Sequence, residues 1–344
     1  MFMLGIYIIV QIVDLIQIWG NLPLMTATIF LLFTNLALGT KVINAIWRKN
    51  TILSMLEESN DELSNESREL GKEIIRRSDR ETTKQLALYF ALSYTTVLGW
   101  ASSAEKNQLP LRAWYPYDTS KTPTYQLTYA HQTIAVSLAA VVNICLDTLV
   151  TSLIAQCRCR LRLLALSLRN LCDDLEISDK GVMTDASNTI VSERLQNCVL
   201  RHQTVLAQTR LLQTCFSASI FAQFCVSMVI ICVTAYQLAF STSFTRVVSM
   251  VAYLTVMMLQ VFLYCYHGNQ LVEESEGVSG AAYDCPWYTC SLPIRRSLLL
   301  LMTRTRRAAR LTAAGFTELS LSSFMSIIKA SYTFFTVLQQ MEES

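Results

Sequence analysis

The chain has 344 residues, of which 52% are hydrophobic and only 16% are charged. Soluble domains carry roughly 25% charged residues, so this composition and a mean hydropathy of +0.35 predict a membrane protein. The net charge of +2 gives no basic surface for nucleic acid, which we exclude as a partner. Ten glycines and six prolines are too few for a fibrous or low-complexity chain.

Seven stretches stay apolar for about 20 residues, the length that a membrane-crossing helix needs. They are residues 1–19, 22–47, 85–103, 124–156, 211–240, 247–267 and 318–341. We therefore predict an all-α, polytopic membrane protein with seven transmembrane helices. The fourth stretch would be roughly 50 Å long, more than a bilayer core of ~30 Å. Its end, with Asp147 and Arg158, is expected to project from the membrane.

The basic residues orient the predicted helices. Segments 48–84, 157–210 and 268–317 fall on one side and carry eight, eight and six Lys or Arg residues. The segments on the other side carry only Lys106, Arg112, Lys121 and Arg246. Because basic residues gather on the cytosolic side, we predict an inverted topology with a cytosolic N-terminus and an extracellular C-terminus. A G-protein-coupled receptor has the opposite orientation, which disfavours that class.

The predicted cytosolic segments have a helical pattern. Leucines at spacings of three and four indicate one buried helix face, at Leu161, Leu164, Leu168, Leu171 and Leu175. We expect the fourth, fifth and sixth spans to continue as helices below the membrane and to pack together there. Segment 48–84, with eight basic and nine acidic residues, is predicted to be a solvated, salt-bridged helical connector.

The chain is thereby divided into three parts. Residues 1–267 hold the first six spans, and residues 268–317 form a cytosolic anchor. Residues 318–344 hold the seventh helix and a short extracellular tail.

The sequence offers no pattern that predicts an enzyme, a metal site or a cofactor. The three histidines stand far apart, without a second ligand at the spacing of a metal motif. Cys157-x-Cys159 and Cys285-x4-Cys290 lack a further pair or a histidine at zinc spacing. We interpret these cysteines as structural thiols.

Two lysines fall inside predicted spans, where a charge is costly unless it reaches water or a partner. Lys41 lies six residues from the cytosolic end of its span, so we expect its side chain to extend to the membrane surface. For Lys329 two interpretations stay open. Its charge either faces a vestibule or joins an ion pair in the cytosolic base.

The C-terminal part carries a specific pattern of residues. It comprises Gly268-Asn269-Gln270-Leu271, Glu274-Ser275, residues 282–288, the basic run 304–310 and residues 319–335. These blocks resemble the C-terminal signature of insect odorant receptors. Residues 333–341 also fit the frame of the sister family of gustatory receptors with two substitutions, but the blocks at 282–288 and 320–335 favour the odorant branch.

The resemblance implies an odorant-gated, non-selective cation channel in the plasma membrane of the olfactory neuron dendrite. The chain would be the odorant-sensing subunit of a hetero-tetramer with a common co-receptor, and it would conduct monovalent and divalent cations. Two alternatives remain: a gustatory-type channel that works without the co-receptor, and a metabotropic seven-helix chemoreceptor.

The resemblance also implies a pore along the outer half of the seventh span. Val337 and Met341 match the family's apolar gate, and Gln340 matches the polar position beside them. Apolar rings close a pore by dewetting, and a spacing of four places both gate residues on one helix face. From spacing alone, ordinary packing residues are the favoured interpretation.

An odorant pocket is implied in the outer half, among the second, third, fourth and sixth spans. Ser93, Thr96 and Trp100 share one face, which resembles the face that lines the pocket in the family. The full set of candidate ligand-binding residues is Phe30, Phe33, Ser93, Thr96, Trp100, Tyr129, His131, Ala135, Tyr253 and Met257. For each residue alone, core packing or an interfacial aromatic belt is the plain alternative. The lining suggests a small aromatic or heterocyclic volatile, such as a phenol or an indole.

Overall fold

The computed structural model describes residues 2–18, 22–102, 123–175, 183–240 and 244–343. Its helices are α1 (Phe2–Gln17), α2 (Leu22–Trp47), α3 (Lys49–Ser64), α4 (Glu69–Ser102), α5 (Thr124–Arg169), α6 (Asp185–Phe240), α7 (Phe244–Asp284), a 3-10 turn η1 (Trp287–Thr289), α8 (Leu292–Thr305) and α9 (Leu321–Glu343). A two-stranded antiparallel hairpin, β1 (Thr312–Ala313) and β2 (Thr317–Glu318), joins α8 to α9. The predicted helical fold is confirmed, and the hairpin is an addition that the sequence pattern did not indicate.

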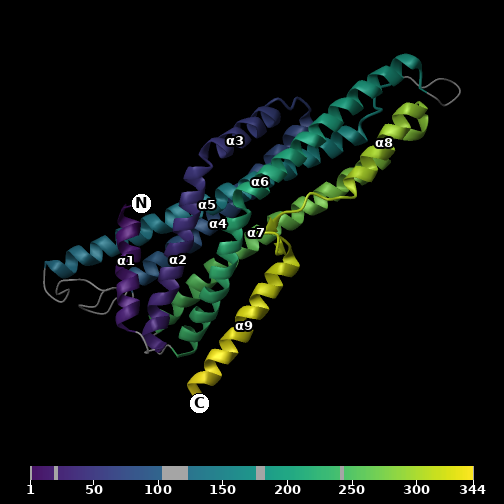
Figure 1. The fold of residues 1–344 in the computed structure, drawn as a ribbon. Coiled ribbons are helices and arrows are strands. Elements are labelled where there is room, and N and C mark those ends of the chain that lie inside the picture. The colour runs from purple at the N-terminus through teal and green to yellow at the C-terminus, as the bar shows by residue number, and fades with distance from the viewer. Residues whose placement is uncertain (1, 19–21, 103–122, 176–182, 241–243, 344) are drawn as a thin grey trace.

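The molecule is elongated, and the long helices α5, α6 and α7 run through two regions of it (Figure 1). In the region that we call the bundle, they pack with α1, α2 and the C-terminal half of α4. In the region that we call the base, the remaining stretches of the same three helices (150–169, 185–220 and 261–284) pack with α3 and α8. Helix α9 leaves the base and contacts α6 and α7 at the edge of the bundle (Figure 1).

Three helices of the described part are long and apolar enough to cross a membrane, judged by length and composition. They are α5, α6 up to Ala239 and α7 from Val247. The number of spans and the inverted topology therefore stay predictions. The expected extension of the fourth, fifth and sixth spans is confirmed, because α5 continues to Arg169, α6 begins at Asp185 and α7 ends at Asp284.

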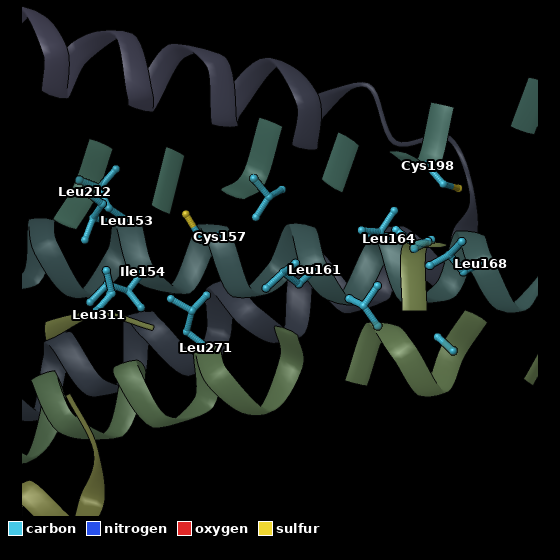
Figure 2. Close-up of a cluster of buried hydrophobic side chains, with 14 of the residues drawn as sticks. Leu153, Ile154, Cys157, Leu161, Leu164, Leu168, Cys198, Leu212, Leu271 and Leu311 are labelled. Atoms are coloured by element: carbon cyan, nitrogen blue, oxygen red, sulfur yellow. The ribbon is translucent and has the colours of Figure 1, made fainter. Parts of the chain in front are cut away.

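The leucine stripe of α5 forms the centre of the base. Leu161, Leu164 and Leu168 have no exposed surface, and Leu171 is 1% exposed. Figure 2 shows Leu161, Leu164 and Leu168 between α5 and its neighbours, together with Leu271 of α7 and Leu311. Each fully buried leucine contributes about 1.5–3 kcal/mol, so the predicted stripe is the main apolar contact of this region.

The predicted connector is helical and salt-bridged, but it is broken into two helices. The chain turns between α3 and α4, where Arg68 donates to both carboxylate oxygens of Glu66, at 2.8 and 2.9 Å. This hydrogen bonding lowers the pKa of Glu66 below its usual value. Glu62 of α3 is in turn ion-paired with Arg160 of α5 and Arg201 of α6. Charged residues of the connector therefore form ion pairs with the base, in addition to facing solvent.

A close contact and a hydrogen-bonded hairpin fix the path of the chain before α9. Gly268 of α7 lies against Leu319, and a Cβ at Gly268 would be 2.4 Å from the Leu319 carbonyl oxygen. The hairpin turn needs positive φ at Ala314 and Gly315, a conformation that glycine adopts without strain. Gln213 of α6 holds the hairpin by accepting from the Thr312 N–H and donating to the Thr312 carbonyl, both at 2.8 Å.

The cysteines of the base are free thiols. Cys172 Sγ and Cys290 Sγ lie 3.6 Å apart, and both side chains are buried. A hydrogen bond with Cys285 raises the pKa of Cys172 to about 11, which keeps that thiol protonated and weakly reactive at neutral pH. These contacts support the interpretation as structural thiols.

Candidate ligand-binding site

A cavity of about 100 Å³ lies inside the bundle, between α2, α4, α5 and α7. Its lining is mostly apolar, with alanine and valine from α5 leaving the space that larger side chains would fill. The lining residues are Thr34, Asn35, Leu38, Tyr89, Ser93, Thr96, Val97, Val136, Ala139, Ala140, Asn143, Ile144, Tyr253, Val256 and Met257. Enclosed apolar cavities with a few polar groups are the usual form of small-molecule sites.

Helical spacing explains which residues each helix contributes. On α4, Tyr89, Ser93 and Thr96 follow one another at steps of four and three, so they occupy one face. The α5 residues between Val136 and Ile144 follow the same rule. The cavity therefore forms where one face of each helix meets the same space.

Most polar groups of the lining are already bonded within the protein. The hydroxyls of Thr34 and Tyr253 lie 2.8 Å apart, and Thr96 Oγ1 donates to the carbonyl of Leu92 at 2.9 Å. Ser93 differs, because its Oγ is buried and finds no hydrogen-bond partner in the part of the chain that the structure describes. A hydroxyl without a partner inside an apolar cavity is suited to bond a polar group of a ligand.

Comparison with known proteins identifies the family. The sequence model of the family described as "7tm Odorant receptor" matches residues 21–332, which is most of the chain. The chain belongs to the insect odorant receptor family.

Relatives and solved structures agree with this assignment. The chain is 25% identical to odorant receptor 94a of Drosophila melanogaster, over 93% of this chain and 81% of that protein. It is 27% identical to putative odorant receptor 85d of the same species, over 74% of this chain but only 60% of the relative's length. The olfactory receptor OR5 of Machilis hrabei, solved in complex with eugenol, superposes with a TM-score of 0.84 at 22% identity, over 98% of this chain and 87% of that one. This likeness shows that the two chains share a fold.

The cavity of this odorant receptor brings together part of the predicted residue set. Ser93, Thr96, Tyr253 and Met257 all line it. Phe33 instead packs against the buried apolar cluster beside the cavity. The side chains of Phe30 and Trp100 lie outside the described part of the structure.

The predicted residues of α5 lie too near its N-terminus to reach this cavity. Tyr129, His131 and Ala135 are half-buried and do not line it, whereas the lining begins at Val136. The ring of Tyr129 lies near that of Tyr125, with ring centroids 6.1 Å apart and the planes tilted by 41°.

Sequence reasoning missed four polar residues of the cavity lining, Thr34, Asn35, Tyr89 and Asn143. Tyr89 lies four residues before Ser93, so extending the predicted face inward by one turn would have found it. For Asn143 the signal was a polar residue in the middle of an apolar helix.

The expectation for Lys41 was wrong. Its ammonium group does not extend to the membrane surface but lies in the bundle, 2.5 Å from Oδ1 of Asp147. The two side chains are 5% and 4% exposed. Asp147 is buried beside the cavity, and Arg158, on the stretch of α5 that lies in the base, is also buried, at 1% exposure. An ion pair that removes both charges from solvent is the better solution for a charge in an apolar bundle.

The predicted pore residues lie on the last turns of α9. Val337 is 48% exposed in the isolated chain, and Gln340 is exposed as well. The side chain of Met341 is outside the described part. Lys329 is exposed, and the ion pairs among the described residues do not include it, so both interpretations of its charge stay predictions.

Proposed function

We propose that this chain is the odorant-sensing subunit of a non-selective cation channel in the plasma membrane. One observation carries the proposal: a member of the odorant receptor family holds an apolar cavity in its helical bundle with one unbonded hydroxyl among the described lining residues, from Ser93. In this proposal the pore is completed by the odorant receptor co-receptor in a hetero-tetramer, and monovalent and divalent cations pass through it.

The ligand would be a small, mainly apolar volatile with one hydrogen-bonding group. A cavity of about 150 Å³ lined by apolar side chains holds benzene, and the cavity here is somewhat smaller, at about 100 Å³. The ligand should therefore be no larger than a single ring or require some widening of the cavity, and a hydroxyl or ring N–H on it would bond the hydroxyl of Ser93. The relative from Machilis hrabei was solved with eugenol, which supports phenols and similar aromatic compounds as the first compounds to test.

Helix α9 would line the pore, with Val337 and Met341 as the gate and Gln340 beside them. Support comes from the apolar side chains that α9 leaves uncovered in the single chain, including Met325 at 51%, Phe334 at 53% and Val337 at 48% exposure. Such a surface on a helix at the edge of the bundle is suited to contact other subunits or membrane lipid.

The first experiment records currents from cells that express the chain with and without the co-receptor, with phenol, indole and toluene as ligands. The expected result is an odorant-evoked current in excised patches without nucleotide, which depends on both subunits. A current from this chain alone would contradict the hetero-tetramer and favour the gustatory-type channel. A response that is lost on excision would favour a metabotropic receptor.

The second experiment tests the ligand-binding role of Ser93. Ser93→Ala is expected to weaken the potency of phenol about fivefold, the worth of one hydrogen bond of ~1 kcal/mol, while any toluene response stays unchanged. Ser137→Ala is the matched control, because Ser137 already donates to the carbonyl of Thr133 on its own helix. Equal changes for phenol and toluene would contradict a hydrogen bond between Ser93 and the ligand.

A further inference from the structure

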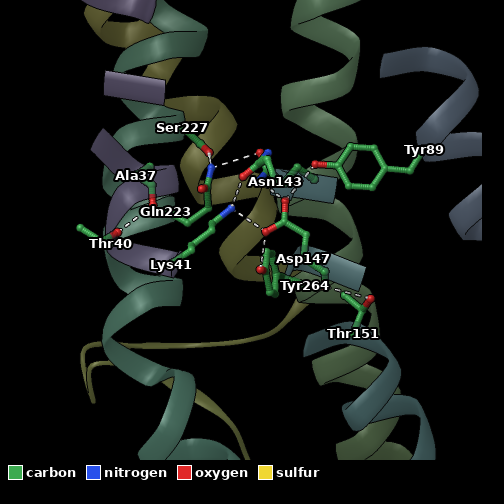
Figure 3. Close-up of polar contacts among 11 residues, drawn as sticks. Ala37, Thr40, Lys41, Tyr89, Asn143, Asp147, Thr151, Gln223, Ser227 and Tyr264 are labelled. Atoms are coloured by element: carbon green, nitrogen blue, oxygen red, sulfur yellow. Dashed lines mark hydrogen bonds and ion pairs between the residues drawn. The ribbon is translucent and has the colours of Figure 1, made fainter. Parts of the chain in front are cut away.

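One buried carboxylate joins four side chains beside the cavity (Figure 3). On Oδ1, Asp147 accepts from Lys41 Nζ at 2.5 Å and from the Tyr264 hydroxyl at 2.8 Å. On Oδ2 it accepts from the Tyr89 hydroxyl at 2.9 Å and from the side-chain amide of Gln260. These five residues are all buried and come from α2, α4, α5 and α7.

Two members of this network also line the cavity. Tyr89 donates to Asp147, and Asn143 accepts from Lys41 Nζ at 2.9 Å. Both side chains are part of the cavity wall. A ligand that moves either side chain therefore changes a hydrogen bond of the buried ion pair directly.

The network also continues towards α9. Gln260 accepts from Gln223 of α6 at 3.1 Å, and Gln223 donates to Ser227 at 2.8 Å. The next residue of α6, Met228, accepts through its carbonyl from Ser331 Oγ of α9 at 3.3 Å, in a contact that this hydroxyl shares with the carbonyl of Ile327 on α9 at 2.9 Å. Ser331 is 1% exposed, so this contact lies inside the interface between α6 and α9. Polar contacts thus lead from the cavity wall to the helix that we propose as the pore lining.

We infer that Lys41 and Asp147 are positioning residues that couple occupation of the cavity to the placement of α9. This inference rests on the proposed function, since it requires a ligand in the cavity and a pore at α9. A ligand shifts a channel towards its open state only by binding that state more tightly. The network offers a physical origin for this difference in affinity. When Tyr89 or Asn143 moves, the hydrogen bonds around the buried carboxylate of Asp147 must rearrange as a group.

A double-mutant cycle tests this coupling in cells that also express the co-receptor. The variants are Lys41→Met, Asp147→Asn and the double variant, all uncharged and close in size to the native side chains. The readout is the largest current evoked by phenol or indole divided by the current evoked by an agonist of the co-receptor, with surface protein measured in the same cells. A purely structural role would reduce surface protein and both currents together.

The expected result is that Asp147→Asn lowers this current ratio about fivefold or more, the usual size of an allosteric coupling, at surface levels matched to the wild type. The double variant should be no worse than Asp147→Asn alone, because both changes break one network. Two results would overturn the inference. The double variant could lower the current ratio by the product of the two single effects, or Asp147→Asn could leave the ratio at the wild-type value. No odorant current from the wild type would instead refute the proposed function.

A milder variant tests the far end of the network without disturbing the ion pair. Ser331→Ala removes the contact to Met228 and is expected to lower the current ratio about twofold, since coupling positions of this kind contribute 0.5–2 kcal/mol. Ser326→Ala is the matched control on the same helix, because exposed Ser326 donates to the carbonyl of Ser322 on α9 itself and makes no bond to another helix among the described residues. Equal ratios for the two serine variants would also overturn the inference.

Discussion

The base and the bundle share three long helices but are filled in different ways. In the base, α5 presents fully buried leucines at Leu161, Leu164 and Leu168. In the bundle, the same helix presents Ala139, Ala140 and the polar Asn143 to a cavity. The size of the side chains along α5 therefore differs between the close-packed core of the base and the cavity of the bundle.

The two regions also use charge differently. The base also buries arginines in ion pairs, but their carboxylate partners keep some exposure: Glu81 beside Arg158 is 36% exposed, and Glu62 beside Arg160 is 20% exposed. The bundle buries Lys41 with Asp147 beside its cavity. A buried pair is weak evidence for stability, and its position beside the cavity is instead compatible with a role in the response to ligand. The comparison suggests that changes in the base affect folding, whereas changes in the bundle affect ligand response.

The largest effect is expected from removing a leucine of the base. Leu161→Ala leaves a void in a core without exposed surface and should cost about 2–5 kcal/mol of unfolding free energy. The melting temperature of detergent-solubilised protein measures this loss. Leu70→Ala is the control, because Leu70 of α4 is 66% exposed. Equal melting temperatures for both variants would contradict a tightly packed base.

The next largest effect is expected where the base meets α9. In Gly268→Ala the new Cβ would overlap the backbone of Leu319, and such overpacking costs about 1–3 kcal/mol. Surface protein and co-receptor-agonist current should both fall. Gly277→Ala and Gly280→Ala on the same helix meet no atom within 4 Å and should be tolerated. If Gly268→Ala were equally tolerated, the close contact between α7 and Leu319 would be in doubt.

In the bundle, filling the cavity should abolish the response without unfolding the protein. Ala139→Leu adds three carbons to the wall of a cavity of about 100 Å³. The odorant-evoked current should fall at least about tenfold, equal to 1.4 kcal/mol of lost ligand binding, while the co-receptor-agonist current is retained. Ala130→Leu, at an exposed position of α5, serves as the control. Loss of both currents in Ala139→Leu would contradict the division between base and bundle.

The smallest effect is expected at the turn of the connector. Arg68 lowers the pKa of Glu66, so this carboxylate stabilises the fold above its unfolded pKa of about 4.3 and loses that effect as pH falls through its folded pKa. Glu66→Gln should lower the free energy of unfolding at pH 7 by less than about 1 kcal/mol, as expected for a partly exposed pair, and the melting temperature should fall slightly. The difference from wild type should close as pH falls below the folded pKa of Glu66. Glu69→Gln, in an exposed pair with Lys72, should have no measurable effect at either pH.

Much of the helical framework was predictable from local pattern. The leucine spacing after residue 160 predicted the core of the base, and the apolar stretches predicted the long helices. The face with Ser93 and Thr96, together with Tyr253 and Met257, also lies at the cavity. The helices and the buried leucines were predictable because side-chain periodicity sets the buried face of a helix, whatever that face later packs against, whereas the ligand-binding role of the cavity residues stays a prediction.

The depth of the cavity and the buried ion pair were decided only by the tertiary structure. The lining begins at Val136 rather than at Tyr129. The sequence of an apolar helix such as α5 does not show where neighbouring helices separate, so this position could not be predicted. Lys41 and Asp147 each looked like an isolated charge in an apolar helix, because their contact spans 106 residues of sequence. Composition and periodicity by themselves determined a helical membrane protein and its buried faces. Packing across four helices determined which polar groups meet, since a hydrogen bond depends on the position of both partners in space.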